Sequence, residues 1–236
     1  MKTEDLVAKF DVTPSSWRSS GFRLLSDQID PHGVVGWGQS LTLERLVLAY
    51  SLGIFPWPHD GELFWFCPPQ RGVLEFQHLN INKRFLRKYH NTDRAKGGSY
   101  TYTLNKDFKT VIRKCATQPR KGQAGTWITD YMIEAYERLE RAGHILSFEC
   151  WRGQDLVGGL YGVLSKDKKQ IISFSAESVF GAESDVAKFC LMTAIQYLQE
   201  QGLQWMDIQM VTPLTKSFGG HLESRDVFLR RIGVIL

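Results

Sequence analysis

The order of hydrophobic segments between residues 145 and 211 constrains the fold of this chain more than any other sequence feature. Two β-type runs are separated by a short polar connection containing Arg152 and Gly153, which predicts a hairpin, and a third β-type run follows. An amphipathic helix of about 17 residues comes next, with Ser184 as candidate N-cap and Gly202 at its end, before a last strand. This order predicts an α+β fold with one helix packed on a mixed sheet. The five segments are expected at 145–151, 155–164, 170–180, 185–201 and 205–211.

The N-terminal half has a different pattern, with helices and breakers in place of successive strands. Helices are expected after the candidate caps Thr42, Asn82 and Asn105, and over residues 130–142. Residues 54–70 contain four prolines and several large aromatic residues, which favours an ordered loop over a regular element. We therefore divide the 236 residues into three parts: a loose arm, a basic N-terminal domain and a sheet-containing C-terminal domain, expected at 1–20, 21–122 and 123–236.

Positive charge is concentrated in residues 83–121, which hold twelve Lys and Arg residues against two Asp residues. The window has a net charge of +10 in a chain of net +4, so the other residues together carry −6. Such asymmetry is typical of a surface that binds a polyanion, because each phosphate neutralised by Lys or Arg releases a counterion. A solvated helical face that carries no ligand remains an equal alternative from the charges alone.

Several common classes of protein are not supported by the residues. The N-terminal segment has no signal-peptide pattern, and no run reaches the ~18 apolar residues of a spanning helix. The four cysteines are far apart, which favours reduced, buried thiols in a cytoplasmic protein over disulfides or a zinc site. Phosphate-binding glycine loops and the Gly-x-Ser-x-Gly motif are absent. We expect no metal and no bound cofactor.

Polar residues interrupt two of the apolar strands. Asp207 and Gln209 stand two positions apart in one strand, so period-two alternation predicts that both side chains lie on one face, and Glu177 interrupts the 170–180 run. A buried carboxylate costs several kcal/mol unless it is paired or functional. The three residues are therefore candidates for a catalytic site, although a solvated sheet face would also explain them.

Six strings, in order from about Gly33 to Leu229, carry a clear resemblance to a known family. They are GVVGWGQSLTLERLVLAYSLGIFPWP, FWFCPPQRGVL, GTWIT, AYERLERAGHILSFECWRGQDLVGGLYGV, SAESVF and MDIQ, and together they resemble leucyl/phenylalanyl-tRNA protein transferases. The resemblance implies a small N-terminal α/β domain and a C-terminal domain of the acetyltransferase-like (GNAT-type) fold used without coenzyme A. It also implies transfer of leucine or phenylalanine, with methionine as a further candidate, from charged tRNA to a protein that begins with Lys or Arg and is thereby marked for degradation.

The resemblance also implies roles for particular residues. Trp57, Trp127 and Tyr136 would hold the terminal adenosine of tRNA, and Asp207, Gln209 and Glu177 would be catalytic. We expect Asp207 to orient Gln209, whose side-chain oxygen would accept a hydrogen bond from the attacking amine, and Asp207 and Glu177 to attract a basic acceptor. The aminoacyl pocket would be formed by Leu160, Val179, Leu191, Ala194 and Met206. The tRNA backbone would lie along Lys83, Arg84, Arg87, Lys88, Arg113, Lys114, Arg120 and Lys121.

The segment after Gln209 departs from the family pattern. Where relatives carry an Asn-Asp-His stretch, this chain has Thr212, Pro213 and Leu214, and Ala194 replaces a bulkier pocket residue. The departure leaves open a transferase with another acceptor, or a non-catalytic tRNA-binding relative. A monomer is favoured.

Overall fold

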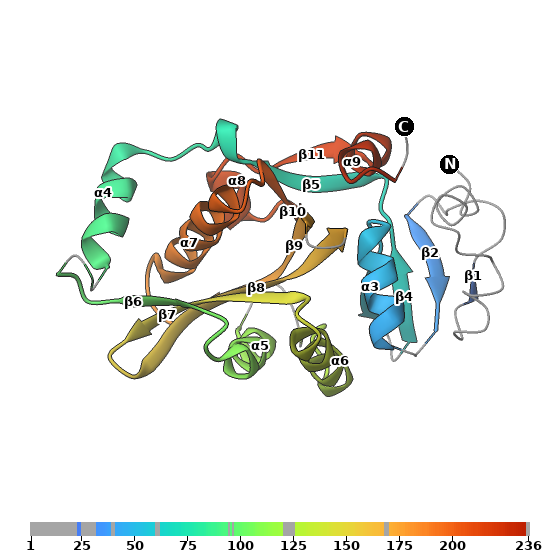
Figure 1. Cartoon of the computed structure of the whole chain (residues 1–236), viewed down its shortest axis with the longest axis horizontal. Coiled ribbons are helices and arrows are strands. Elements are labelled where there is room, and N and C mark those ends of the chain that lie inside the picture. Colours follow the sequence, from blue (N-terminus) through green and yellow to red (C-terminus); the bar gives the residue numbers. More distant parts are fainter. Residues whose placement is uncertain are drawn as a thin grey trace.

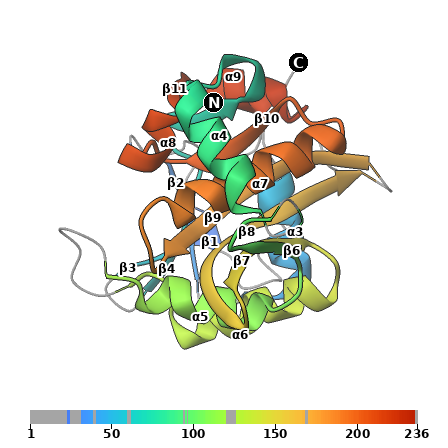
Figure 2. The same cartoon turned by 90° about the vertical axis from the view of Figure 1, so that its left-hand side faces the viewer.

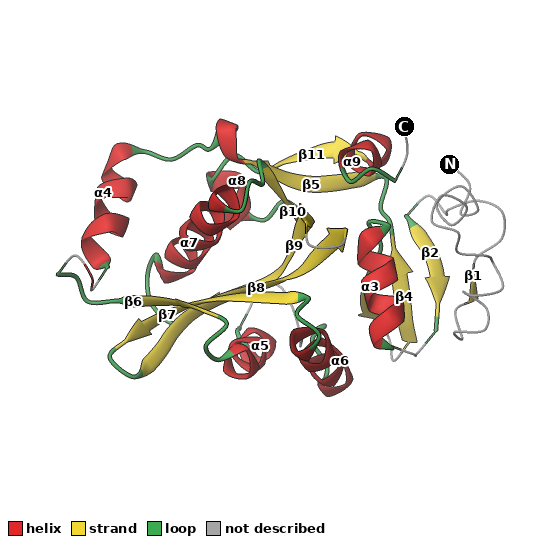
Figure 3. Ribbon diagram, in the orientation of Figure 1, coloured by secondary structure: helices red, strands yellow, loops and turns green. Residues whose placement is uncertain are grey.

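The computed structural model describes residues 23–24, 32–38, 41–59, 62–93, 95, 97–119, 126–167 and 170–234. The arm predicted at residues 1–20 lies outside these residues. The described chain is an α+β fold with two sheets (Figures 1 and 3). The smaller sheet has the strand order β1-β2-β4-β3, and the larger has the order β11-β5-β10-β9-β8-β7-β6.

The small sheet is built from β1 (Arg23–Leu24), β2 (Val34–Trp37), β3 (Phe55–His59) and β4 (Glu62–Phe66). The prediction of an irregular loop over residues 54–70 is wrong, because β3 and β4 form an antiparallel pair there. Pro56 and Pro58 are tolerated because β3 is an edge strand, where a missing N–H breaks no central ladder. The preceding helix α3 (Leu43–Ser51) has Thr42 as its N-cap, as predicted.

The large sheet contains β5 (Gln70–Glu75), β6 (Thr101–Leu104), β7 (Ile145–Arg152), β8 (Asp155–Asp167), β9 (Gln170–Gly181), β10 (Trp205–Gln209) and β11 (His221–Ser224). The predicted hairpin is confirmed as the antiparallel pair β7–β8, and β10 pairs in parallel with β9. Strands β5 and β6 come from residues before 123, so both halves of the sequence contribute to this sheet.

Helices cover both faces of the large sheet. They are α4 (Lys83–Thr92), α5 (Phe108–Thr117), α6 (Asp130–Arg141), α7 (Val186–Glu200), α8 (Pro213–Ser217) and α9 (Arg225–Arg231), with the short 3-10 helix η1 (Phe76–His78) after β5. On β8, Gly158 lies against Val186 of α7 whereas the next residue, Gly159, lies against Val111 of α5. Successive residues of a strand point to opposite faces, so α7 and α5 lie on opposite sides of the sheet (Figure 2).

Two predicted helix caps differ from the structure. Asp107, not Asn105, caps α5, because the Asn105 side chain instead accepts a hydrogen bond from the backbone of Ser147. Asp185 rather than Ser184 is the residue before α7, in a left-handed conformation. Asn82 is confirmed as the cap of α4, where its side chain accepts from the amide of Phe85.

Candidate active site

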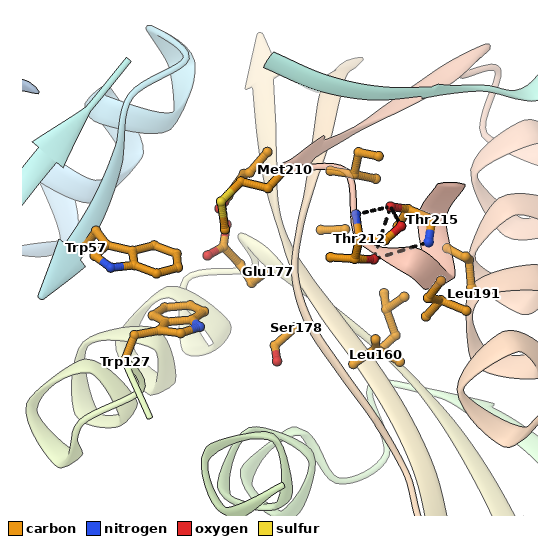
Figure 4. Close-up of a pocket in the computed structure, with 14 residues that line it drawn as sticks. Trp57, Trp127, Leu160, Glu177, Ser178, Leu191, Met210, Thr212 and Thr215 are labelled. Atoms are coloured by element: carbon orange, nitrogen blue, oxygen red, sulfur yellow. Dashed lines mark hydrogen bonds between the residues drawn. The ribbon is translucent and has the colours of Figure 1, made fainter. Parts of the chain in front are cut away.

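A cavity of about 230 Å³ opens beside the ends of β9 and β10 (Figure 4). Its wall is mostly apolar, and Glu177 is the one ionisable side chain among the described residues that line it. The lining residues are Trp57, Trp127, Leu160, Ala176, Glu177, Ser178, Val179, Leu191, Ile208, Gln209, Met210, Thr212, Leu214 and Thr215. A small apolar cavity with few polar groups is the usual form of a small-molecule site.

Two adjacent bulges explain why the sheet opens at this point. Against β8, Ser178 pairs with Tyr161 and Ala176 with Gly162, which leaves Glu177 as the extra residue of β9. Against β5, Asp207 and Gln209 pair with consecutive residues, which leaves Ile208 as the extra residue of β10. Among the described residues, β9 and β10 pair in parallel at Asp207 and Ser175, and the residues that come next, 176–179 on β9 and 208–209 on β10, line the cavity. Bulges re-aim side chains and end pairing, so they create this site.

The bulge of β10 gives Asp207 and Gln209 different surroundings, although alternation predicts a shared face. Asp207 is fully buried and does not line the cavity, whereas Gln209 does. The Asp207 carboxylate accepts hydrogen bonds from Arg71 Nε and Nη2 at 2.8 and 2.6 Å, from Ser175 Oγ at 2.8 Å and from the Gln209 amide at 2.9 Å. Asp207 therefore contacts Gln209 through the backbone. The φ of Gln209 is 54°, a conformation that non-glycine residues rarely adopt and that clusters at functional sites.

Glu177 and Gln209 form a second polar group at the cavity wall. Gln209 Nε2 donates to Glu177 Oε1 at 2.7 Å, so the side-chain oxygen of Gln209 is the atom left to accept a hydrogen bond from a ligand. Behind them, the hydroxyl of Tyr136 donates to Glu177 Oε2 at 3.3 Å and lies 2.5 Å from the hydroxyl of Tyr50. The four side chains form a continuous chain from the cavity into the core.

Burial governs the protonation of this chain. It raises the pKa of Glu177 to about 8, with the negative charge of Asp207 adding to the rise and hydrogen bonds from Tyr50 and Tyr136 opposing it. Burial and the nearby Glu177 also raise the pKa of both tyrosines well above 10, so their hydroxyls remain donors at neutral pH. At neutral pH Glu177 therefore favours its protonated form, and a cation bound beside it would favour the ionised form.

Trp57 and Trp127 form the other end of the cavity. Their rings are stacked on each other, with centroids 5.3 Å apart and planes at 16°. Both side chains are half-buried, so the pair presents an aromatic surface to the cavity (Figure 4). The rings come from β3 and from the residues just before α6, which are far apart in the sequence.

The structure brings some of the predicted pocket residues to the cavity and leaves others in the core. Leu160, Val179 and Leu191 line the cavity, whereas Ala194 and Met206 are fully buried and do not. Tyr136 is also fully buried, so it contacts Glu177 and does not reach the cavity surface that the tryptophans provide. Sequence reasoning did not identify several lining residues or Arg71, the partner of Asp207; the missed lining residues are Ala176, Ser178, Ile208, Met210 and Thr215.

The predicted tRNA-contacting cations lie on two separate helices. Lys83, Arg84, Arg87 and Lys88 are exposed on α4, and Arg113 and Lys114 are exposed on α5, which covers the opposite face of the sheet from α7. Lys88 is paired with Asp185 at 2.6 Å and Arg113 with Glu137 at 2.9 Å. Arg120 and Lys121 lie outside the described residues. Helix α4 packs near α7, because the hydroxyl of Tyr89 contacts Thr193 at 3.0 Å.

Two further features concern the described residues alone. Within them, no group of three or more His, Cys, Asp or Glu residues is placed to hold a metal ion. No helix among them combines the length and apolarity needed to cross a membrane.

The fold thus carries an apolar cavity with a stacked tryptophan pair at one end, and comparison with known proteins identifies the family. Residues 39–69 match the family described as the leucyl/phenylalanyl-tRNA protein transferase N-terminal domain. Residues 73–233 match the family described as leucyl/phenylalanyl-tRNA protein transferase. The chain is 38% identical over 204 residues to the leucyl/phenylalanyl-tRNA–protein transferase of Solidesulfovibrio magneticus, covering 86% of this chain and 78% of that one. It is 38% identical over 202 residues to the corresponding protein of Christiangramia forsetii, covering 85% and 91%.

The chain therefore belongs to the leucyl/phenylalanyl-tRNA protein transferase family, and it is an aminoacyltransferase. Among solved structures, that of L-PGS from Bacillus licheniformis matches 71% of this chain and 50% of that chain at 11% identity with a TM-score of 0.40, which is too distant to support an argument.

Proposed function

We propose that the cavity holds the 3′ end of an aminoacyl-tRNA, with the terminal adenosine on the tryptophan pair and the amino-acid side chain at the apolar end. The observation that carries this proposal is the layout of the cavity: Trp57 and Trp127 lie at one end, Leu160 and Leu191 at the other, and Glu177 between them (Figure 4). An ester that joins adenosine to an amino acid would place its carbonyl in the middle, beside Glu177 and its partner Gln209.

The aromatic end suits a ligand that all tRNAs share. Stacking on an indole ring contributes about 1–3 kcal/mol per base and tolerates any base. Because Trp57 and Trp127 already contact each other, the adenine would stack on an exposed face of the pair rather than between the rings. Leucine, phenylalanine and methionine would all fit an apolar end whose discrimination per methylene is about 1–3 kcal/mol.

The transfer step needs positioning more than a strong base. A protein α-amine has a pKa of about 7.7–8.0, so a useful fraction is neutral near pH 7. The amine nitrogen attacks the ester carbonyl, the new C–N bond forms, the C–O bond to the ribose breaks, and the proton of the amine ends on the ribose 3′-oxygen. No ATP is required because the ester is already activated. The side-chain oxygen of Gln209 accepts a hydrogen bond from the amine and holds it in line with the carbonyl.

The three polar residues have different roles in this proposal. Gln209 and Glu177 contact the substrates, whereas Asp207 is a positioning residue that holds the Gln209 backbone. Attraction of a basic acceptor residue, Lys or Arg, falls to Glu177 alone, since Asp207 is buried and its charge is matched by Arg71.

Several broader features belong to the same proposal. The tRNA backbone would follow the exposed cations of α4, and those of α5 where the RNA reaches the opposite face. The catalytic part would be an acetyltransferase-like arrangement used without coenzyme A, which the order β7-β8-β9-α7-β10 and the separated parallel pair β9–β10 support. We keep the division at residues 122 and 123, a monomer, cytoplasmic action on charged tRNA and N-degron tagging as parts of this proposal.

The experiment that tests the proposal incubates the protein with tRNAs charged with radiolabelled Leu, Phe or Met and with peptides that begin with Arg, Lys, Asp or Glu. We expect label on the Arg and Lys peptides, and none from uncharged tRNA mixed with free amino acid. Absence of label on every peptide, with the folded protein present at high concentration, would contradict the proposal.

A second candidate is a transferase with a different acceptor. The observation that favours it is the position of Thr212, Leu214 and Thr215, which line the cavity where the family pattern departs. The same assay decides between the two, because label on the Asp or Glu peptides alone would support the second.

A further inference from the structure

Arg71 of β5 lies at the centre of a buried polar cluster. Asp207 of this cluster has a role in the function proposed above, whereas Arg71 has none. Its side chain is 1% exposed, and its guanidinium makes a two-pronged pair with the Asp207 carboxylate. The remaining nitrogen, Nη1, donates to the carbonyl of Gly53 at 3.1 Å. All three nitrogens of the guanidinium therefore donate hydrogen bonds.

Two aromatic rings pack against the same guanidinium. The carbon at its centre lies 4.6 Å from the centroid of Phe55, from the small sheet, and 4.6 Å from that of Phe228, from α9. Gly53 allows this arrangement: its φ is 73°, and a Cβ at this position would lie 2.7 Å from the ring of Phe228. Contacts from Gly53 and Phe55, and from Phe228 far along the sequence, thus hold the side chain of Arg71 in one orientation.

The orientation of Arg71 affects the cavity through Asp207, which bonds both Arg71 and the backbone of the cavity residue Gln209. The carboxylate has its acceptor positions filled by Arg71, Ser175 and the Gln209 amide. The hydrogen bond from the backbone N–H of Gln209 to Asp207 spans the bulge of β10, where Gln209 has its left-handed conformation. A carboxylate that could rotate would not hold that amide, and the bulge would be free to relax toward regular pairing.

We propose that Arg71 is a positioning residue for aminoacyl transfer, which acts through Asp207 to fix the bulge that presents the Gln209 side chain to the cavity. The inference rests on the function proposed above. Phe55 and Phe228 have a supporting role, because their rings prevent the Arg71 guanidinium from tilting away from the Asp207 carboxylate. Planarity and two parallel N–H donors are essential, so lysine cannot replace Arg71.

The alternative is that the pair contributes to stability alone. Buried ion pairs are often replaced by apolar residues without loss of stability, whereas removal of one partner leaves an unpaired charge. The double variant Arg71→Met with Asp207→Leu removes both charges together, and it separates folding from positioning. A matched control is Arg231→Met, because Arg231 makes a similar two-pronged pair with Glu223 and packs on Trp205 but does not contact Asp207.

The test measures kcat and KM for transfer from Leu-tRNA to an Arg peptide, with thermal unfolding of each variant. We expect the double variant to fold cooperatively, with kcat reduced about 100-fold, the size of effect that a small misplacement of a reacting group produces. Its KM for Leu-tRNA should change less than about threefold, because the residues proposed to hold the tRNA end and the leucine side chain, Trp57, Trp127, Leu160 and Leu191, do not lie on β10. Arg71→Lys should fold and lose about tenfold in kcat, a loss of roughly 1.4 kcal/mol in transition-state binding. Arg231→Met should keep wild-type kcat.

Wild-type kcat in the folded double variant, or in Arg71→Lys, would overturn the inference. Should the double variant fail to fold, Arg71→Lys decides the question by itself, since it retains the positive charge. A wild-type protein that transfers nothing would contradict the proposed function instead, so the two failures are distinguished.

Discussion

Two polar groups lie next to each other at β10, and they differ in burial and in how completely they are bonded. The first, around Asp207 and Arg71, is fully buried, and the Asp207 carboxylate makes four hydrogen bonds. The second, Glu177 with Gln209, lies at the cavity wall, and the structure shows no partner among the described residues for the side-chain oxygen of Gln209. Under the proposed mechanism, the first group holds the backbone rigid and the second contacts the substrates, and the backbone amide of Gln209 joins the two.

The largest effect is expected for Asp207→Ala. The change leaves the Arg71 charge buried without its partner, which costs about 3–5 kcal/mol of folding free energy, and it also releases the Gln209 amide. Urea unfolding should show a large loss of folding free energy, and transfer kinetics should show a large loss of kcat. Unchanged stability would contradict the assignment of Asp207 to the buried group.

Gln209→Ala should reduce transfer nearly as much while affecting stability far less. Loss of one aligned polar contact to the reacting atoms typically lowers kcat about 10²–10³-fold. Folding free energy should fall by only about 1–3 kcal/mol, because the hydrogen bond to Glu177 is lost while alanine meets the same cost of the positive φ that glutamine already does. Comparison of kcat with the unfolding midpoint checks the result, and a kcat within threefold of wild type would show that Gln209 does not contact the amine.

Trp57→Ala should act on binding rather than on chemistry. Removal of one ring of the stacked pair is expected to weaken charged-tRNA binding by about 1–3 kcal/mol, seen as a higher KM with similar kcat. Trp205→Phe is a suitable control, since Trp205 packs against Phe228 away from the cavity. Equal KM values for wild type and Trp57→Ala would remove the tryptophan pair from the substrate site.

The pH dependence of the folding free energy should reflect the raised pKa of Glu177 in the second group. Because the folded pKa of Glu177 is raised to about 8, the native state holds a proton that the unfolded state releases above its own pKa of about 4.3. Stability contributed by Glu177 is therefore greatest at low pH and falls as the pH rises from about 4.5 to 8. Relative to wild type, Glu177→Gln should gain about 1–3 kcal/mol across this window, measured by urea unfolding at pH 5 and pH 8. A constant difference between the two proteins would refute the raised pKa.

The smallest effect is expected for Arg87→Ala on the exposed face of α4. Loss of one phosphate contact should weaken tRNA binding slightly and reduce the slope of log K against log salt by about one unit. Binding titrations at several salt concentrations measure that slope. An unchanged slope would show that this part of α4 does not contact RNA.

Sequence patterns predicted the elements whose cause is local. Helical spacing and caps predicted α3, α4 and α6, and polar interruptions identified Glu177, Asp207 and Gln209 as unusual. The bulges at Glu177 and Ile208 could not be predicted, because they depend on which strands become neighbours. Arg71 was missed for the same reason: it lies 136 residues from Asp207 in the sequence. Proline content likewise argued against β3, since the edge position that permits Pro56 appears only in the assembled sheet.

The most direct test of the central claim is a structure of the protein with a stable analogue of 3′-leucyl adenosine in which an amide replaces the ester. We expect adenine stacked on the pair Trp57 and Trp127, the leucine side chain between Leu160 and Leu191, and the carbonyl beside Gln209. An analogue bound elsewhere, or one in this cavity with its carbonyl turned away from Gln209, would contradict this claim.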